Sequence, residues 1–183
     1  MMNKIDLDKL RFPIGKFEKP SIISAEQITI WINDIEQFPK KLCKLVEELP
    51  NEALDWKYRP KGWNIKQVVH HCADSHINSF CRFKLSLTED TPTIKPYFEE
   101  KWAELPDVID ADINDSLQII KGLHSRWTIL LKALQENDFE KEFIHPEHGK
   151  RFSVAENIGV YAWHGNQHLA CLLYTSPSPR DLA

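Results

Sequence analysis

The stretch NIKQVVHHCADSHINSFCRFKLSL, residues 64–87, shows the pattern on which the predicted fold rests. Its apolar residues recur at helical spacing along one face, namely Val68, Cys72, Phe80 and Phe83. His71 lies within this inward-facing stripe. Asn64 is a suitable helix cap, with Gln67 at the third position after it. We therefore expect an amphipathic helix that begins at Asn64 and carries a histidine on its buried face.

Three further segments show the same one-sided pattern. Between residues 24 and 49 the apolar positions alternate in steps of three and four, although Pro39 predicts a kink or a break into two helices. A third helix is expected over residues 113–134. The fourth begins at a capping box formed by Ser153 and Glu156. Four helices with single apolar faces pack most economically with those faces inward, which predicts an all-α four-helix bundle.

Two connections interrupt this helical pattern. Residues 139–152 alternate polar and apolar side chains around a turn-like PEHG, which predicts a small β-hairpin before the fourth helix. Residues 88–112 form a long loop before the third helix, rich in proline and aromatic residues. Loops of this length in compact domains tend to be lids or binding segments.

Composition excludes several classes of protein. The chain has 183 residues, of which 42% are hydrophobic, enough for the core of one folded domain. The net charge of -4 and the absence of a basic cluster argue against nucleic-acid binding. The sequence contains no apolar run long enough to span a membrane and no signal-peptide pattern, so we expect a cytoplasmic protein. Four cysteines without a CxxC pair indicate reduced structural thiols.

Histidines carry most of the chemical information. His164 and His168 are four residues apart on a predicted helix, so both side chains lie on one face and can bind one metal ion. If their helix neighbours the one with His71, three imidazoles converge and leave coordination positions open, as in catalytic metal sites. The alternative is that His71 forms hydrogen bonds inside the core while the other two are ordinary face residues.

Other polar residues have alternative roles. Asp74 follows His71 by three residues on the same face, where it could orient a ligand or accept a proton, or else face solvent or act as a cap. His76 is awkwardly spaced for sharing an ion with His71, and His124 occupies a core position with no ligand role. Two histidines of the hairpin region are expected on the surface, His145 and His148.

Common catalytic motifs are missing from the sequence. It contains no GxSxG, GxxxxGK[ST], GxGxxG or HExxH motif, so serine hydrolase, nucleotide-binding and zincin functions have no local support. The chemistry is therefore expected to come from a bound metal or from a co-substrate.

Two separated segments resemble a known family. GWNIKQVVHHCADSHINSFCRFKLSLTEDTPTIKPYFEEKW (62–102) and YAWHGNQHLA (161–170) are similar to the YfiT branch of the DinB-like superfamily. The early segment RFPIGKFEKP (11–20) resembles the start of that family, so the resemblance covers about residues 10–172. It implies a DinB-type four-helix bundle, a homodimer and one divalent metal per subunit.

The resemblance also implies a ligand set and an activity. The ligands fall on His71, the second histidine of the HH pair, and on His164 and His168 of the WHxxxH segment. Zinc and nickel both suit three imidazoles plus waters. The implied activity is a metal-dependent hydrolase acting on a small molecule, with water activated by the metal and Asp74 or a nearby histidine as general base. The alternative is a bacillithiol S-transferase, in which the metal activates a low-molecular-weight thiol.

The C-terminus departs from the family pattern. After HLACLL the chain reads YTSPSPRDLA, residues 174–183, where family members continue the helix. Pro177 and Pro179 would stop a helix. We therefore expect one helical domain over residues 1–173 and a non-native tail over residues 174–183, whose presence could weaken metal binding.

Overall fold

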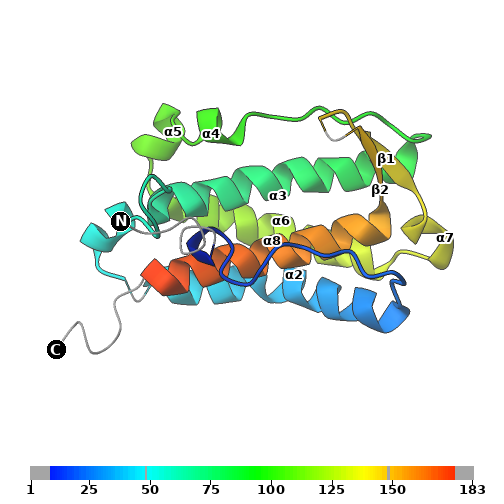
Figure 1. Ribbon diagram of the computed structural model, residues 1–183, viewed down its shortest axis with the longest axis horizontal. Helices are drawn as coiled ribbons and strands as arrows, with labels where there is room; N and C mark the ends of the chain where they lie inside the picture. Colours follow the sequence, from blue (N-terminus) through cyan, green and yellow to red (C-terminus); the bar gives the residue numbers. More distant parts are fainter. Residues whose placement is uncertain (1–8, 48, 148, 176–183) are drawn as a thin grey trace.

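Four long helices form the body of the protein (Figure 1). The computed structural model describes residues 9–47, 49–147 and 149–175. The long helices are α2 (Ala25–Glu47), α3 (Ile65–Thr88), α6 (Ile113–Lys132) and α8 (Val154–Thr175). The predicted all-α four-helix bundle is therefore confirmed.

The order of the helices around the bundle differs from their order in the chain. Helix α2 packs against α6 and α8, and α3 packs against the same two helices. The consecutive helices α2 and α3 therefore lie at opposite corners. Long connections are needed for this arrangement, and the one between α2 and α3 includes a short 3₁₀ helix, η1 (Asn51–Asp55).

Helix starts agree with the capping patterns of the sequence. Asn64 Oδ1 accepts a hydrogen bond from the backbone N–H of Gln67 at 2.8 Å, and Gln67 Oε1 accepts one from the N–H of Asn64 at 3.1 Å. This reciprocal pair satisfies two backbone donors that the first turn leaves free. A serine hydroxyl accepts the equivalent backbone N–H at the starts of α2 and α8, in the pairs Ser24–Gln27 and Ser153–Glu156.

Pro39 does not divide α2, so of the predicted kink or break the break is wrong, and the kink stays a prediction. The helix runs without interruption from Ala25 to Glu47. A proline inside a helix costs about 3 kcal/mol, because it removes a hydrogen bond and crowds the preceding turn. Burial of one face of α2 against α6 and α8 offsets this cost. The carbonyl of Ile35, four residues before Pro39, lies 2.6 Å from His124 Nδ1 of α6.

The two predicted connections are present with additional structure. The hairpin consists of β1 (Glu142–His145) and β2 (Lys150–Ser153), paired antiparallel and preceded by the short helix α7 (Glu136–Phe139). The long connection between α3 and α6 includes two short helices that the loop prediction missed, α4 (Glu99–Trp102) and α5 (Pro106–Ile109). It runs along α3 (Figure 1).

This connection is attached to the hairpin at its start. Ile94 N–H donates to the carbonyl of Ile144 at 3.0 Å, and Ile144 N–H donates to the carbonyl of Pro92 at 2.9 Å. His145, expected on the surface, is buried at the end of β1, so that expectation is wrong. His148 lies outside the described residues.

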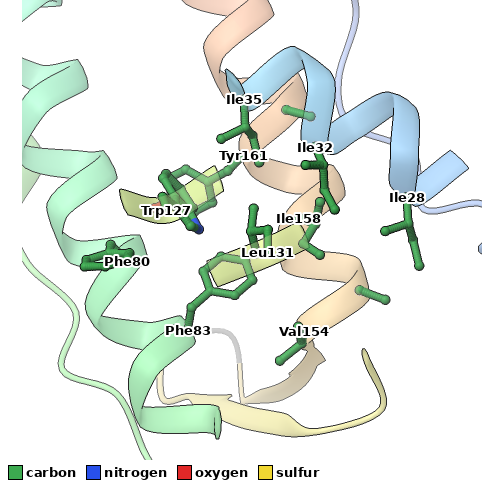
Figure 2. Close-up of a cluster of buried hydrophobic side chains, with 12 residues drawn as sticks. Ile28, Ile32, Ile35, Phe80, Phe83, Trp127, Leu131, Val154, Ile158 and Tyr161 are labelled. Atoms are coloured by element: carbon green, nitrogen blue, oxygen red, sulfur yellow. The ribbon is translucent and has the colours of Figure 1, made fainter. Parts of the chain in front are cut away.

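Two apolar clusters fill the bundle. Figure 2 shows the first, in which Trp127 and Leu131 of α6 pack among residues of the other three helices. The second cluster centres on Leu42 of α2, Val69 of α3, Ile120 of α6 and Leu172 of α8. Each cluster takes residues from all four helices, so together they hold the helices in fixed register.

Glycines let α8 approach α2 closely. A Cβ atom at Gly159 would lie 2.8 Å from the Trp31 ring, and one at Gly165 would lie 2.9 Å from the Phe38 ring. Both distances are shorter than normal carbon contacts. Gly165 lies directly after His164, so this close packing also sets the position of the histidine relative to α2.

Helix α8 extends two residues into the predicted tail, residues 174–183. Tyr174 and Thr175 still belong to the helix, two residues past the expected domain end, and residues 176–183 lie outside the described part of the chain. Within the described ranges, no helix has the length and apolar character required to cross a membrane.

Candidate metal centre

Three histidines from two helices meet near the middle of the bundle. His71 of α3 and His168 of α8 each place Nε2 at 3.2 Å from the Nε2 of His164. One nitrogen from each ring lies within 4.8 Å of the other two. His71 is buried, whereas the other two rings are partly exposed. The structure thus brings together the three residues that the sequence singled out.

The geometry and chemistry of this triad fit a divalent metal. Ligands at about 2.0–2.1 Å from a tetrahedral zinc are about 3.3 Å apart, close to the 3.2 Å between the Nε2 atoms here. Burial, followed by the neighbouring imidazoles, lowers the pKa of His71 and His164, and burial lowers that of His168 to about 4. The three rings are therefore neutral at pH 7, the form that binds metals.

One side of the triad opens into an aromatic cavity of about 600 Å³. The aromatic cavity is lined by Tyr97, Phe98, Phe143, Phe152 and Tyr161, with Arg82 as a cation and His164 on its wall. The Tyr97 hydroxyl is buried beside Ser75, which also lines this cavity. The cavity therefore offers apolar surface together with the polar side chains of Ser75 and Tyr97.

The triad also opens into a charged cavity of about 890 Å³. All three histidines of the triad line the charged cavity, and the Trp63 ring lies 4.6 Å from that of His71. Both basic and acidic side chains line it, including Arg11, Lys57, Arg59, Glu100 and Glu104. His164 and the carboxyl residues Glu99 and Glu100 line both cavities, so the triad lies where the two meet.

Two further histidines extend inward from the triad, and the sequence had assigned neither of them a role at the site. His76 Nε2 lies 3.0 Å from His164 Nδ1, and His76 Nδ1 lies 2.7 Å from His124 Nε2. Both rings are almost completely buried. Their inward positions could have predicted contacts with other polar groups, because a buried imidazole needs partners for both nitrogens.

Acidic residues are placed differently from the prediction. Asp74 lies one turn after His71 but lines neither cavity, and burial followed by nearby Asp107 raises its pKa to about 6. Glu99, which the sequence did not single out, lines both cavities as an exposed residue, and its partial desolvation followed by Glu100 raises its pKa. The role predicted for Asp74 stays a prediction.

Comparison with known proteins places this architecture in a family. Residues 34–172 match the sequence pattern of the DinB superfamily. A protein of Bacillus cereus strain 03BB102 named "Putative metal-dependent hydrolase" is 50% identical over 164 residues, which cover 90% of this chain and 94% of the relative. A Bacillus anthracis protein of the same name is 49% identical over the same shares of both chains.

A solved structure agrees with these sequence matches. It is described as "YfiT from Bacillus subtilis is a probable metal-dependent hydrolase with an unusual four-helix bundle topology". The two chains are 44% identical with a TM-score of 0.89, over 92% of this chain and 96% of the other. The present chain is therefore a helical-bundle protein that belongs to the DinB superfamily, and within it the chain is YfiT-like.

Proposed function

We propose that this chain is a metal-dependent hydrolase that binds one divalent ion, zinc or nickel, through His71, His164 and His168. The observation that carries the proposal is the set of three neutral imidazoles whose Nε2 atoms face one another where two cavities meet. An ion bound there supplies a Lewis acid that activates water at neutral pH. The names of the relatives agree with this chemistry.

The two cavities indicate the kind of substrate. Volumes of about 600 and 890 Å³ suit a small molecule. We expect the apolar part of the substrate to lie in the aromatic cavity, against Phe143 and Tyr161, and its polar part to lie in the charged cavity. The bond to be broken then lies beside His164, whose side chain lines both.

Glu99 is the proposed proton carrier. It lines both cavities, and its raised pKa makes the carboxylate a stronger base than an ordinary glutamate. Asp74 has a suitable pKa of about 6 but no place on either cavity wall. We therefore expect Glu99→Gln to lower kcat by about 100-fold or more, and Asp74→Asn to change it less than about threefold, when both variants are loaded with metal. The reverse order would assign the role to Asp74.

A second candidate function is a bacillithiol S-transferase. Two cavities that meet at one metal centre have room for two reactants. The cysteine that lines the charged cavity, Cys171, has its pKa raised to about 11 by burial, so it is not a thiolate at pH 7. The nucleophile would then be water for the hydrolase, or the thiol of a co-substrate for the transferase.

One assay separates the two functions. The metal-loaded chain is incubated with p-nitrophenyl esters, and separately with monobromobimane with and without bacillithiol; the His71→Ala variant is the control. Ester cleavage without thiol, lost in the control, supports the hydrolase. Thiol-dependent consumption of the bimane beyond the uncatalysed rate supports the transferase. Metal binding without either activity would contradict both and leave a metal-binding module.

We also propose that the chain acts in the cytoplasm, as expected from the sequence patterns above, and that it is a homodimer, as its resemblance to the YfiT branch implies. Light scattering after size-exclusion chromatography measures the mass directly. A mass of one chain at micromolar concentration would contradict the dimer.

A further inference from the structure

Three histidines, two of them buried, connect the metal centre to the backbone of α2. His164 Nδ1 lies 3.0 Å from His76 Nε2, and His76 Nδ1 lies 2.7 Å from His124 Nε2. His124 Nδ1 lies 2.6 Å from the carbonyl oxygen of Ile35. Each ring comes from a different helix, and the inner two are almost completely buried. We call this series, from Ile35 through His124 and His76 to His164, the histidine relay.

The carbonyl at one end sets the position of every proton in the relay. A carbonyl oxygen can only accept, so His124 must carry its proton on Nδ1. A neutral His124 then accepts at Nε2 from Nδ1–H of His76, and a neutral His76 accepts at Nε2 from Nδ1–H of His164. His164 is left with a lone pair on Nε2, the atom that faces His71 and His168.

We propose that the Ile35 carbonyl, acting through His124 and His76, holds His164 in the tautomer that directs its Nε2 lone pair at the metal. His76 and His124 are thus positioning residues, because neither lies in the group of possible ligands. Outer partners of this kind fix the orientation and tautomer of a metal-binding histidine. This inference rests on the metal centre proposed above.

Pro39 explains why the Ile35 carbonyl is available. In an α-helix the carbonyl of residue 35 accepts from the N–H of residue 39. Pro39 has no N–H, so this acceptor is left free in the interior of α2, and His124 occupies it. The proline that predicted a break in the helix therefore supplies the anchor of the relay.

His168 provides an internal comparison on the same helix. Its Nδ1 is buried and has no hydrogen-bond partner within the described parts of the chain. The relay therefore supports one ligand of the triad, and a change in it should affect His164 before it affects His168.

The tautomers can be measured without metal or substrate. Protein labelled with ¹⁵N at histidine is studied at pH 7.5 by long-range ¹H–¹⁵N correlation, first metal-free and then with one equivalent of zinc. We expect protons on Nδ1 of His76, His124 and His164 in both samples. A proton on Nε2 of His76 or His124 would overturn the relay even if zinc still binds, so its failure is distinguishable from failure of the metal site.

A matched pair of variants tests the effect on metal binding. His124→Phe keeps the ring shape but removes both hydrogen bonds, whereas His124→Gln keeps a donor and an acceptor. We expect zinc affinity, from chelator competition, to fall about 10-fold or more for His124→Phe and less than about threefold for His124→Gln. Equal affinities in all three proteins, or equal losses in both variants, would overturn the proposal.

Pro39→Ala tests the anchor itself. The new N–H competes with His124 for the Ile35 carbonyl and restores a helical hydrogen bond. We expect the metal-free variant to melt at the same or a higher temperature than the wild type, while its zinc affinity falls severalfold. Unchanged affinity in this variant would overturn the role given to Pro39, and loss of both stability and affinity would indicate packing damage instead of the relay.

Discussion

The interior of this bundle is apolar towards its two ends and rich in histidine between them. In three helices histidines come between the last residue of one apolar cluster and the first of the other. They are His76 in α3, His124 in α6, and both His164 and His168 in α8. The apolar clusters exclude water and stabilise the fold in proportion to the area they bury. We call these histidines between the clusters the histidine layer. Its buried nitrogens destabilise the fold unless they have hydrogen-bond partners, because an unpaired buried polar group is costly.

This difference indicates that the apolar clusters and the histidines have separate roles. The clusters hold the helices in register, and the histidine layer uses that register to align nitrogens from separate helices. Changes in a cluster should therefore lower stability and leave metal binding intact, whereas changes in the triad should do the reverse. The following predictions test that separation.

The largest expected effect is on stability, from a residue of the first cluster. Phe83→Ala removes a ring that is almost fully buried against Trp127, and it should lower the free energy of unfolding by about 3–5 kcal/mol. Phe83 is three turns of α3 away from His71, so zinc stoichiometry at 10 °C should stay near one per chain. Urea titration and elemental analysis measure the two quantities. Loss of metal in the folded variant would show that the regions are coupled.

Removing one ligand should have the next largest effect. His71→Ala is expected to weaken zinc binding by more than about 100-fold, beyond the loss that follows removal of an outer partner. The metal-free variant should unfold within about 2 kcal/mol of the wild type, because the apolar clusters remain. Inductively coupled plasma mass spectrometry and calorimetry check this. Retention of one ion per chain would remove His71 from the ligand set.

Acid should destabilise the histidine layer specifically. Burial lowers the pKa of His124 to about 4, below the 6.5 of an exposed imidazole. Between these pH values the unfolded chain binds more protons than the folded one, so stability falls as pH falls from 6.5 towards 4. For His124 alone, the free energy of unfolding falls by about 2 kcal/mol between pH 7 and pH 5.

The measurement is a series of urea titrations of metal-free protein at pH 5–7.5. His76 and His164, whose pKa values burial also lowers, act in the same direction. In the His124→Phe variant the free energy of unfolding should depend less steeply on pH, because up to one proton fewer is taken up on unfolding. Identical slopes in the two proteins would mean that His124 does not contribute.

The smallest expected effect is at the start of α3. Asn64→Ala removes the side-chain acceptor for the N–H of Gln67 and should cost about 1 kcal/mol. Because His71 lies two turns further along the helix, zinc affinity should change by less than about threefold. Ser24→Ala at the start of α2 is the matched control, since it removes an equivalent cap on a helix without ligands. A larger loss of affinity for Asn64→Ala alone would show that the cap positions the ligand.

Local features of the fold could be predicted from the sequence because they depend on neighbouring residues. Apolar spacing gave the four helices, and side chains such as Asn64 and Ser153 marked where two of them begin. The hairpin before α8 followed from alternation around a turn. His164 and His168 share one helix, so their common face needed no tertiary information.

Features that involve two elements were missed or misjudged. Pro39 predicted a kink or a break because its local cost was visible, whereas the packing of α2 that keeps the helix continuous was not. His145 was placed on the surface because nothing in its own segment shows the loop that pairs with β1. His76 was set aside because its spacing from His71 is wrong for one ion, although its partners lie on α6 and α8.

The sequence by itself thus determined which segments are helical, where they begin and which of their faces are apolar, since these properties arise within a few residues of the chain. The tertiary structure alone decided that His71 meets the pair on α8, that His76 and His124 join them, and that the Ile35 carbonyl receives His124. Each of these contacts joins residues from different helices. Their distances depend on how the two apolar clusters pack, which no single segment encodes.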